Sequence, residues 1–265
     1  MKSHRIKNLE DYIVKNESVT LDKLCEVFDV SKNTIRRDVK ELLENGSIKK
    51  IYGGVMINKK KLVPFEERNI KNHDEKIMAA KIAADYIEDG DIIFIDSGTT
   101  TMWLIDFLKN KNNITILTNN LSAVIAALPY PNLNIISLGG NLKRKTNSFV
   151  GNSASLVLKD YNISKSFMAA TGISISRGAT NSSMDEYELK KLIVEKSDEI
   201  FLIVDSTKFD TISLMTYSAL ENIDYVITNE MPTKKYQDFF KKNKINLYKI
   251  NETIFIVGLY SSEYF

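Results

Sequence analysis

The sequence predicts an α/β protein in two parts: a small N-terminal winged helix-turn-helix and a larger domain with a mainly parallel sheet. Two observations predict this fold class. Residues 1–57 contain two closely spaced amphipathic helical patterns followed by a short segment that alternates like a hairpin. From Asp74 onward, helical patterns take turns with short continuous apolar runs, which is typical of a parallel sheet covered on both faces. With 265 residues, of which 43% are hydrophobic, the chain has room for two cores.

The charge is distributed unevenly along the chain. Its formal net charge is only +2, but residues 1–61 hold 14 Lys and Arg against 9 Asp and Glu, whereas the rest holds 22 against 25. The basic character is therefore confined to the N-terminal part. The lone Cys25 excludes an intrachain disulfide, and with two distant histidines no metal site or cofactor is predicted. Because the sequence has no apolar signal segment and no run of about 20 apolar residues, we expect a soluble, cytoplasmic protein.

A helix-turn-helix is predicted after a first helix at 3–16. The second helix starts at the capping residue Thr20 and runs to Phe28, and the Asp29-Val30 link leaves room only for a tight turn. Ser31 then caps a third helix. Apolar residues at helical spacing form the inner faces of the second and third helices: Leu21, Leu24, Val27 and Phe28, then Ile35, Val39, Leu42 and Leu43.

The outer face of the third helix predicts binding to double-stranded DNA. Hydrogen-bond donors crowd its N-terminal half, the part of a recognition helix that reaches base edges and phosphates. Asn45-Gly46 is expected to end the helix, and 47–57 to form a hairpin that serves as a wing, although a hairpin that only closes the small core explains it nearly as well. The predicted DNA-binding residues are Ser31, Lys32, Asn33, Thr34, Arg36, Arg37, Lys40, Lys49 and Tyr52.

The predicted domains are a DNA-binding domain at 1–57, a linker at 58–73, an effector domain at 74–250 and an unassigned apolar tail at 251–265. Within the effector domain, strands are expected at 92–95, 114–118, 133–138, 166–171, 200–204, 225–228 and 245–250. Helices are expected at 74–89, after Thr100, and at 121–128, 153–159, 185–196 and 233–241.

Polar loops follow several of these strands, where open parallel sheets bind ligands. The clearest is Asp96-Ser97-Gly98-Thr99-Thr100, which offers hydroxyls and helix-start N–H groups to an anion, although a helix cap without a ligand would look the same. Lys208 could contact a phosphate, and Asp96 and Asp205 are assigned to sugar hydroxyls or to orienting neighbours. The remaining candidate effector-binding residues are Asn119, Gly139, Gly140, Gly172, Glu188 and Lys190.

Motifs spread over nearly the whole chain give it a family resemblance. Ser31–Asp38, Tyr52-Gly53-Gly54, Pro64–Arg68, Glu75-Lys76, Asp96–Thr100, Thr118–Asn120, Gly139-Gly140 and Asp205–Lys208 occur in this order. The chain thereby resembles the DeoR-type bacterial transcriptional regulators. The resemblance implies a winged helix-turn-helix joined to an effector domain like sugar-phosphate isomerases of the ribose-5-phosphate type. It also implies a repressor of sugar uptake and catabolism operons, controlled by a phosphorylated sugar.

This sequence departs from the family pattern at two places. Ser164 stands where the family usually has an Asp before the strand at 166–171, and the tail after Ile250 has no counterpart. A homo-oligomer is expected, because one DNA-binding module offers only about 600–1,000 Å² to DNA and specific binding usually needs two half-sites. The tail is a candidate for the subunit contact.

Two other functions are consistent with parts of the sequence. A catalytic sugar-phosphate isomerase would share the Asp205–Lys208 loop, but proton abstraction needs a carboxylate base and Ser166–Gly172 offers none. Charged residues at the start of the helix at 185 are expected there as caps or solvated positions in any case. A ligand-independent DNA-binding protein would explain the basic module but not the row of polar strand ends. The sequence therefore predicts a regulator and not an enzyme.

Overall fold

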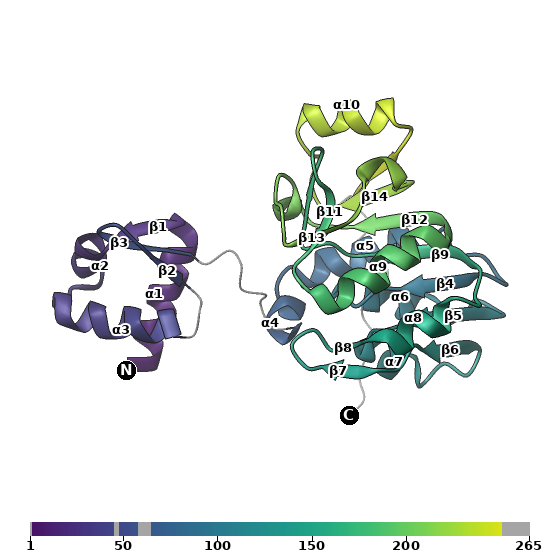
Figure 1. Cartoon of the computed structure of the whole chain (residues 1–265), viewed down its shortest axis with the longest axis horizontal. Coiled ribbons are helices and arrows are strands. Elements are labelled where there is room, and N and C mark those ends of the chain that lie inside the picture. The colour runs from purple at the N-terminus through teal and green to yellow at the C-terminus, as the bar shows by residue number, and fades with distance from the viewer. Residues whose placement is uncertain (1, 45–47, 58–64, 251–265) are drawn as a thin grey trace. The chain divides into compact units, whose positions relative to one another are not determined.

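The computed structural model describes residues 2–44, 48–57 and 65–250, and the chain divides into two compact units, Met1–Leu62 and Val63–Phe265 (Figure 1). The predicted helix stop at Asn45-Gly46, most of the predicted linker and the tail 251–265 lie outside the described residues. No helix in the described part of the chain is long and apolar enough to cross a membrane.

The N-terminal unit is a winged helix-turn-helix, as predicted. Its helices are α1 (Lys2–Asn16), α2 (Leu21–Phe28) and α3 (Lys32–Glu44), and its antiparallel sheet has the order β1-β3-β2, formed by β1 (Ser18–Thr20), β2 (Ile48–Ile51) and β3 (Gly54–Ile57). Strand β1 was not predicted, because three residues are too short to establish an alternating pattern. Its pairing of Val19 with Val55 attaches the segment before α2 to the wing.

Side-chain caps set the helix boundaries of this unit. The Thr20 hydroxyl accepts a hydrogen bond from the Lys23 N–H at 3.2 Å, and Ser31 Oγ accepts one from the Thr34 N–H at 3.3 Å. Asp29 ends α2 in the left-handed conformation at φ 48°. The expectation that Val27 faces inward is wrong, since 43% of it is exposed. The inner face of α2 is rotated past it and consists of Leu21, Leu24, Cys25 and Phe28.

The second unit is built on a seven-stranded sheet with the order β15-β14-β12-β9-β4-β5-β6, in which every neighbouring pair is parallel. This confirms the predicted fold class. The strands are β4 (Ile92–Ile95), β5 (Ile114–Thr118), β6 (Leu133–Ser137), β9 (Ile163–Met168), β12 (Ser197–Ile203), β14 (Tyr225–Thr228) and β15 (Asn246–Lys249).

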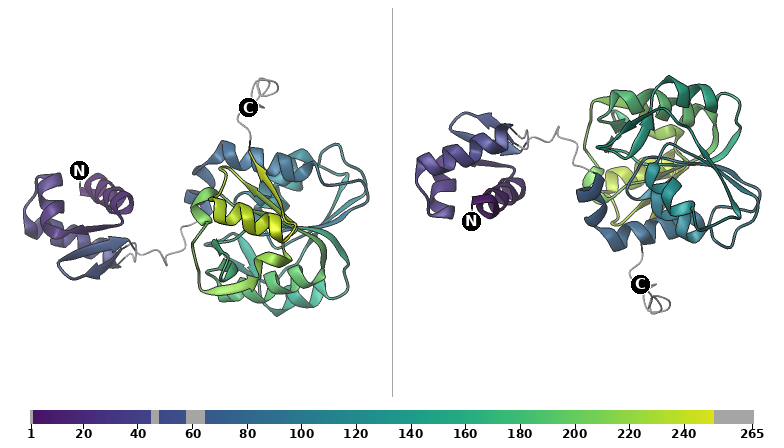
Figure 2. Two further views of the ribbon diagram at one scale, coloured as in Figure 1. Left: turned by 90° about the horizontal axis from the view of Figure 1, so that it is seen from above. Right: turned by 90° about the horizontal axis from the view of Figure 1, so that it is seen from below.

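Helices cover both faces of this sheet (Figure 2). One face carries α5 (His73–Ala84), α6 (Leu104–Phe107) and α7 (Leu121–Ala127), and the other carries α8 (Asn152–Leu158), α9 (Met184–Lys196) and α10 (Lys234–Lys242). In β4, Phe94 packs into the core on the α9 side, whereas Ile93 and Ile95 pack into the core on the α5 side. The continuous apolar run therefore reflects burial of both faces of the strand.

The strand order reverses direction between β4 and β9. From β4 the chain steps outward to β5 and β6, then returns to place β9 on the other side of β4 and continues to β12, β14 and β15. The connections after β4 and after β9 consequently leave the sheet on opposite faces, which opens a crevice at the carboxyl ends of these two strands. Such a switch point is where open α/β sheets bind ligands.

Several short elements were not predicted. They are the hairpin of β7 (Asn141–Lys143) and β8 (Ser148–Val150), and the antiparallel sheet of β10 (Gly172–Ser174), β11 (Gly178–Asn181) and β13 (Met215–Ser218). The assignment of residues up to 73 to a linker is wrong for its C-terminal part. Residues Phe65–Ile70 form α4 and belong to the second unit, where Phe65 is buried and its N–H donates to the Lys145 carbonyl at 3.1 Å.

Candidate effector pocket and DNA-binding surface

The loop after β4 is held in place by its own hydrogen bonds. The Thr101 hydroxyl donates to the Asp96 carbonyl at 2.6 Å and accepts from the Gly98 N–H at 3.2 Å. A Cβ on Gly98 would lie only 2.8 Å from the Cβ of Ala169, so glycine is required where the loop passes β9. The helix expected after Thr100 consists of a 3₁₀ turn, Thr101–Trp103, followed by the single turn of α6. The Gly98 N–H is thus used inside the loop and is not directed at an anion.

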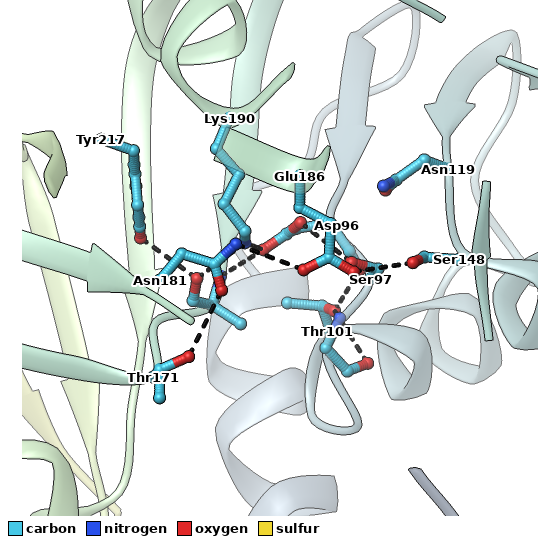
Figure 3. Close-up of polar contacts among 12 residues, drawn as sticks. Asp96, Ser97, Thr101, Asn119, Ser148, Thr171, Asn181, Glu186, Lys190 and Tyr217 are labelled. Atoms are coloured by element: carbon cyan, nitrogen blue, oxygen red, sulfur yellow. Dashed lines mark hydrogen bonds and ion pairs between the residues drawn. The ribbon is translucent and has the colours of Figure 1, made fainter. Parts of the chain in front are cut away.

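A buried ion pair lies behind this loop (Figure 3). Lys190 of α9 pairs with the Asp96 carboxylate, and the two side chains are only 5% and 2% exposed. Asp96 also accepts the Ala169 N–H at 2.9 Å, while Lys190 donates to the Ala169 carbonyl at 3.0 Å. Tyr217 donates to that same carbonyl at 3.1 Å, and burial together with the charge of Asp96 raises the pKa of Tyr217 well above its usual value. The ion pair between Asp96 and Lys190 therefore links β4, β9 and α9 inside the domain.

A second buried acid extends this polar network. Glu186 accepts hydrogen bonds from Ser148 at 2.7 Å and from the Asn181 amide at 3.2 Å, and Asn181 in turn accepts from Thr171 at 3.3 Å (Figure 3). These contacts fix the start of α9 against β8 and β11. Glu188, by contrast, is exposed on α9.

In front of the loop, at the switch point, lies an open cavity whose empty space, including the part open to solvent, is about 610 Å³. Residues from three strand ends line it, namely Gly98–Thr100 after β4, Ala169-Ala170 after β9, and Ile203, Val204, Asp205, Thr207 and Lys208 at and after the end of β12. The opposite wall comes from α4 and α5 and the turn between them. This wall carries Arg68, Lys71 and Lys76, and Lys208 completes a set of four cationic side chains.

The cations in this cavity affect one another. Burial is the main cause that lowers the pKa of Lys76 to about 8, with the charges of Arg68, Lys208 and Lys71 acting in the same direction and Asp205 opposing them. Its ammonium group donates to the Arg68 carbonyl. Burial is also the main cause that lowers the pKa of Arg68, although the carboxylates of Glu186 and Asp96 raise it. Lys208 lies 3.7 Å from Asp205, the one acidic side chain among the described residues of the lining.

The structure brings together one part of the predicted effector-binding set. Gly98, Thr99, Thr100, Asp205 and Lys208 line the cavity. The other members of the predicted set do not line the cavity. Asp96, Ser97 and Lys190 are buried behind the loop, and the lining also lacks Asn119, Gly139, Gly140, Gly172 and Glu188.

Three of the predicted residues outside the lining have structural roles. A Cβ on Gly172 would lie 2.4 Å from the Thr211 carbonyl, so this glycine allows close packing of two loops. Gly140, at φ 106°, makes the turn before β7, where a Cβ would meet the Val150 carbonyl at 2.5 Å. Asn119 donates to the Phe149 carbonyl at 3.4 Å and so supports the β7–β8 hairpin.

Arg68, Lys71 and Lys76 were missed as site residues by the sequence analysis. The first two fell in the segment assigned to the linker, and Lys76 looked like an ordinary residue of an amphipathic helix. The one available signal was their density, since three cations within nine residues precede a domain that is otherwise net acidic.

The outer face of α3 presents a continuous row of donors. Asn33, Arg36, Arg37 and Lys40 are exposed and lie at positions i, i+3, i+4 and i+7 of the helix, opposite the buried Ile35. The neighbouring predicted residues are partly engaged within the unit. Lys32 forms an ion pair with Asp22 at 2.5 Å, and the Thr34 hydroxyl lies 3.0 Å from that of Ser31.

The wing and the base of α3 complete this surface. Tyr52 is fully exposed in the turn between β2 and β3, and Lys49 is exposed on β2. On the inner face of α3, Asp38 is buried and accepts two hydrogen bonds from Arg5, at 2.7 and 3.2 Å, which raise the pKa of Arg5. No role was predicted for Asp38 from the sequence. Its hydrogen bonds to Arg5 fix α3 to α1 and so orient the row of donors.

A winged helix-turn-helix whose third helix exposes a row of basic residues, followed by an α/β domain with a cation-lined cavity at its switch point, is typical of a DNA-binding transcriptional regulator with a sensor domain. Residues 5–61 match the family model of the DeoR-like helix-turn-helix domain, and residues 71–230 match that of the DeoR C terminal sensor domain. The chain belongs to the DeoR family of transcriptional regulators.

Three relatives are similar to this chain over more than nine tenths of their own length. The HTH-type transcriptional regulator IolR of Bacillus subtilis is 46% identical over 94% of this chain and 99% of its own. GolR of Listeria innocua is 31% identical over 84% of this chain and 91% of its own. The lactose phosphotransferase system repressor of Staphylococcus epidermidis is 31% identical over 93% of this chain and 97% of its own.

The family membership decides between the alternative functions. Because the relatives are named as transcriptional regulators, the alternative of a catalytic sugar-phosphate isomerase is wrong, and the match to a sensor domain favours a ligand-responsive regulator. A solved structure of D-ribose-5-phosphate isomerase with phospho-erythronic acid is similar over 52% of this chain and 54% of its own, with a TM-score of 0.39 and 19% identity.

Proposed function

We propose that this protein represses an operon for sugar uptake or catabolism in the cytoplasm and that a phosphorylated sugar, bound in the cavity at the switch point, controls its affinity for operator DNA. The observation that carries the proposal is the charge of that cavity. Four cationic side chains face it, and Asp205 is the one acidic side chain in its described lining. A phosphate group carries a charge of about −1.5 to −2 at pH 7 and offers three acceptor oxygens, which suits such a cluster.

The other lining residues suit the sugar part of the ligand. The Thr99 and Thr100 side chains and the Asp205 carboxylate offer hydrogen bonds to hydroxyl groups, and Asn72 lies on the opposite wall. The names of the relatives add a separate reason, since one is a repressor of a lactose phosphotransferase system.

The DNA-binding face is assigned to Asn33, Arg36, Arg37 and Lys40, with Lys49 and Tyr52 of the wing along the phosphate backbone. We assign the protein to a homo-oligomer, because a single module buries too little surface for specific operator binding. Light scattering at micromolar concentration, with and without operator DNA, tests this. A monomeric mass in both cases would contradict it.

A calorimetric screen of phosphorylated hexoses, pentoses and trioses tests the ligand class, with the unphosphorylated sugars as controls. We expect heat only from phosphorylated compounds, and we expect the double variant Thr99→Ala/Lys208→Ala to bind them at least about tenfold more weakly, because a charge-assisted hydrogen bond contributes about 1.5–3 kcal/mol. Lys191→Ala is the matched control, since Lys191 is exposed on α9 outside the lining. Equal binding of sugars with and without phosphate would refute the site assignment.

The proposed control of DNA binding by the ligand is tested by measuring the affinity for operator DNA. An operator fragment selected from a random DNA pool is titrated with the full-length protein, with and without saturating ligand. A coupling of about 1–3 kcal/mol would change operator affinity roughly 5–150-fold. An operator affinity that stays the same with saturating ligand would refute the switch.

A further inference from the structure

Helix α4 carries a cavity cation but lies outside both family domains. The helix-turn-helix model ends at residue 61 and the sensor model begins at 71, whereas α4 spans Phe65–Ile70. Arg68 lines the cavity from this helix and Lys71 from the residue directly after it. Along the chain, α4 is also the first described element after the DNA-binding unit.

The attachment of α4 to the effector domain is slight. A helix of six residues has no stability of its own in water, so contacts with the domain must hold it. Phe65 is its one fully buried apolar side chain, and the Arg68 guanidinium lies 5.6 Å above the Phe65 ring. Lys76 donates to the Arg68 carbonyl, while Ile70 is 78% exposed.

Electrostatics makes this attachment sensitive to a bound anion. Arg68 and Lys71 belong to the α4 side of the cavity, and Lys76 and Lys208 belong to the body of the domain. Arg68, Lys71 and Lys208 repel Lys76, whereas Asp205 attracts it, and Glu186 and Asp96 attract Arg68. A dianion between the two sides would attract the cations of both sides to one ligand.

We propose, building on the function proposed above, that Arg68 and Lys71 are phosphate-binding residues and that phosphate binding stabilises the docked position of α4 on the effector domain. Ligand occupancy is thereby transmitted to the segment that leads to the DNA-binding unit. A ligand that binds only the docked form at ten times its dissociation constant shifts the docking equilibrium by about tenfold.

Amide hydrogen exchange of the full-length protein, with inorganic phosphate as the probe and chloride at equal ionic strength as the control, tests the proposal. Phosphate at ten times its measured dissociation constant should slow exchange in a peptide covering 65–72 by about tenfold. Lys71→Gln should weaken phosphate binding and abolish this protection, while Ile70→Ala, on the exposed side of the same helix, should leave both unchanged. Phosphate binding without slower exchange at 65–72 would overturn the proposal and leave the cavity assignment intact.

The operator experiment adds a second readout. In Phe65→Ala, which removes the apolar anchor but keeps Lys76, Lys208 and the β4 loop, phosphate should bind the body of the domain at least about tenfold more weakly than it binds wild type, so the variant is assayed at a saturating phosphate concentration. Its effect on operator affinity should fall to about twofold or less, against about 5–150-fold for wild type. Wild-type coupling in this variant would overturn the proposal. If wild-type protein binds no phosphate at all, the cavity assignment is overturned together with it.

Discussion

The low pKa of Lys76 predicts that phosphate binding weakens as the pH rises from 7 to 9. Burial and three neighbouring cations lower the pKa of this ammonium group to about 8. Lys76 is therefore about 90% protonated at pH 7 and about 10% protonated at pH 9. A bound dianion stabilises the charged form, so binding requires that a neutral Lys76 takes up a proton. If only the protonated form binds well, affinity falls by about tenfold over this range, or about 1.4 kcal/mol.

Calorimetry of a phosphorylated sugar at pH 7, 8 and 9 measures this decline. The ligand is itself not the cause, because the second pKa of a phosphate monoester is about 6. In buffers of different ionisation enthalpy at pH 8, binding should take up about half a proton. Lys76→Arg provides the control, since a guanidinium stays charged throughout. A wild-type affinity that does not change with pH, or an equal decline in Lys76→Arg, would refute the reasoning.

Two further predictions concern the DNA-binding face and the buried ion pair. Arg36→Ala and Arg37→Ala should each weaken operator binding by about 1–3 kcal/mol if the contact is bidentate to guanine, and a double mutant whose gel shift equals wild type across salt concentrations would contradict the recognition-helix assignment. Lys190→Met should lower the free energy of unfolding by about 3–5 kcal/mol in urea titrations, because it leaves Asp96 buried and unpaired. Lys191→Met, at an exposed position, should stay within about 0.5 kcal/mol of wild type.

The sequence predicted those elements whose own residues determine their burial. The run Ile92–Ile95 indicated a strand covered on both faces, and the donors of α3 stood out because the opposite face of the same helix is apolar. The strands β10, β11 and β13 were missed because they are short and consist largely of small or polar residues. Their position depends on pairing with distant segments and not on local periodicity.

The candidate site was predicted in part for a similar reason. A polar loop after a buried strand indicates where a ligand can bind, and this rule identified Thr99, Thr100 and Lys208. The rule cannot distinguish a residue that faces the cavity from one such as Asp96, which faces the core and is neutralised there by Lys190. Nor could it find Arg68, because that side chain reaches the cavity only through the packing of α4 against a domain that follows it in sequence.

The charged residues on the two sides of the β4 loop are arranged differently. This difference explains how one loop can be held rigidly on one side and still respond to a ligand on the other. Behind the loop, Asp96 and Lys190 neutralise each other within hydrogen bonds to β9, so this side is satisfied without a ligand. In front of it, four cations face a cavity whose described lining has Asp205 as its one acid. Positive charges therefore outnumber the one acid in this described lining, and a dianion would offset their repulsion. Under the proposals made above, we expect such a pocket to select a phosphorylated ligand over a neutral sugar, with part of the binding free energy holding α4.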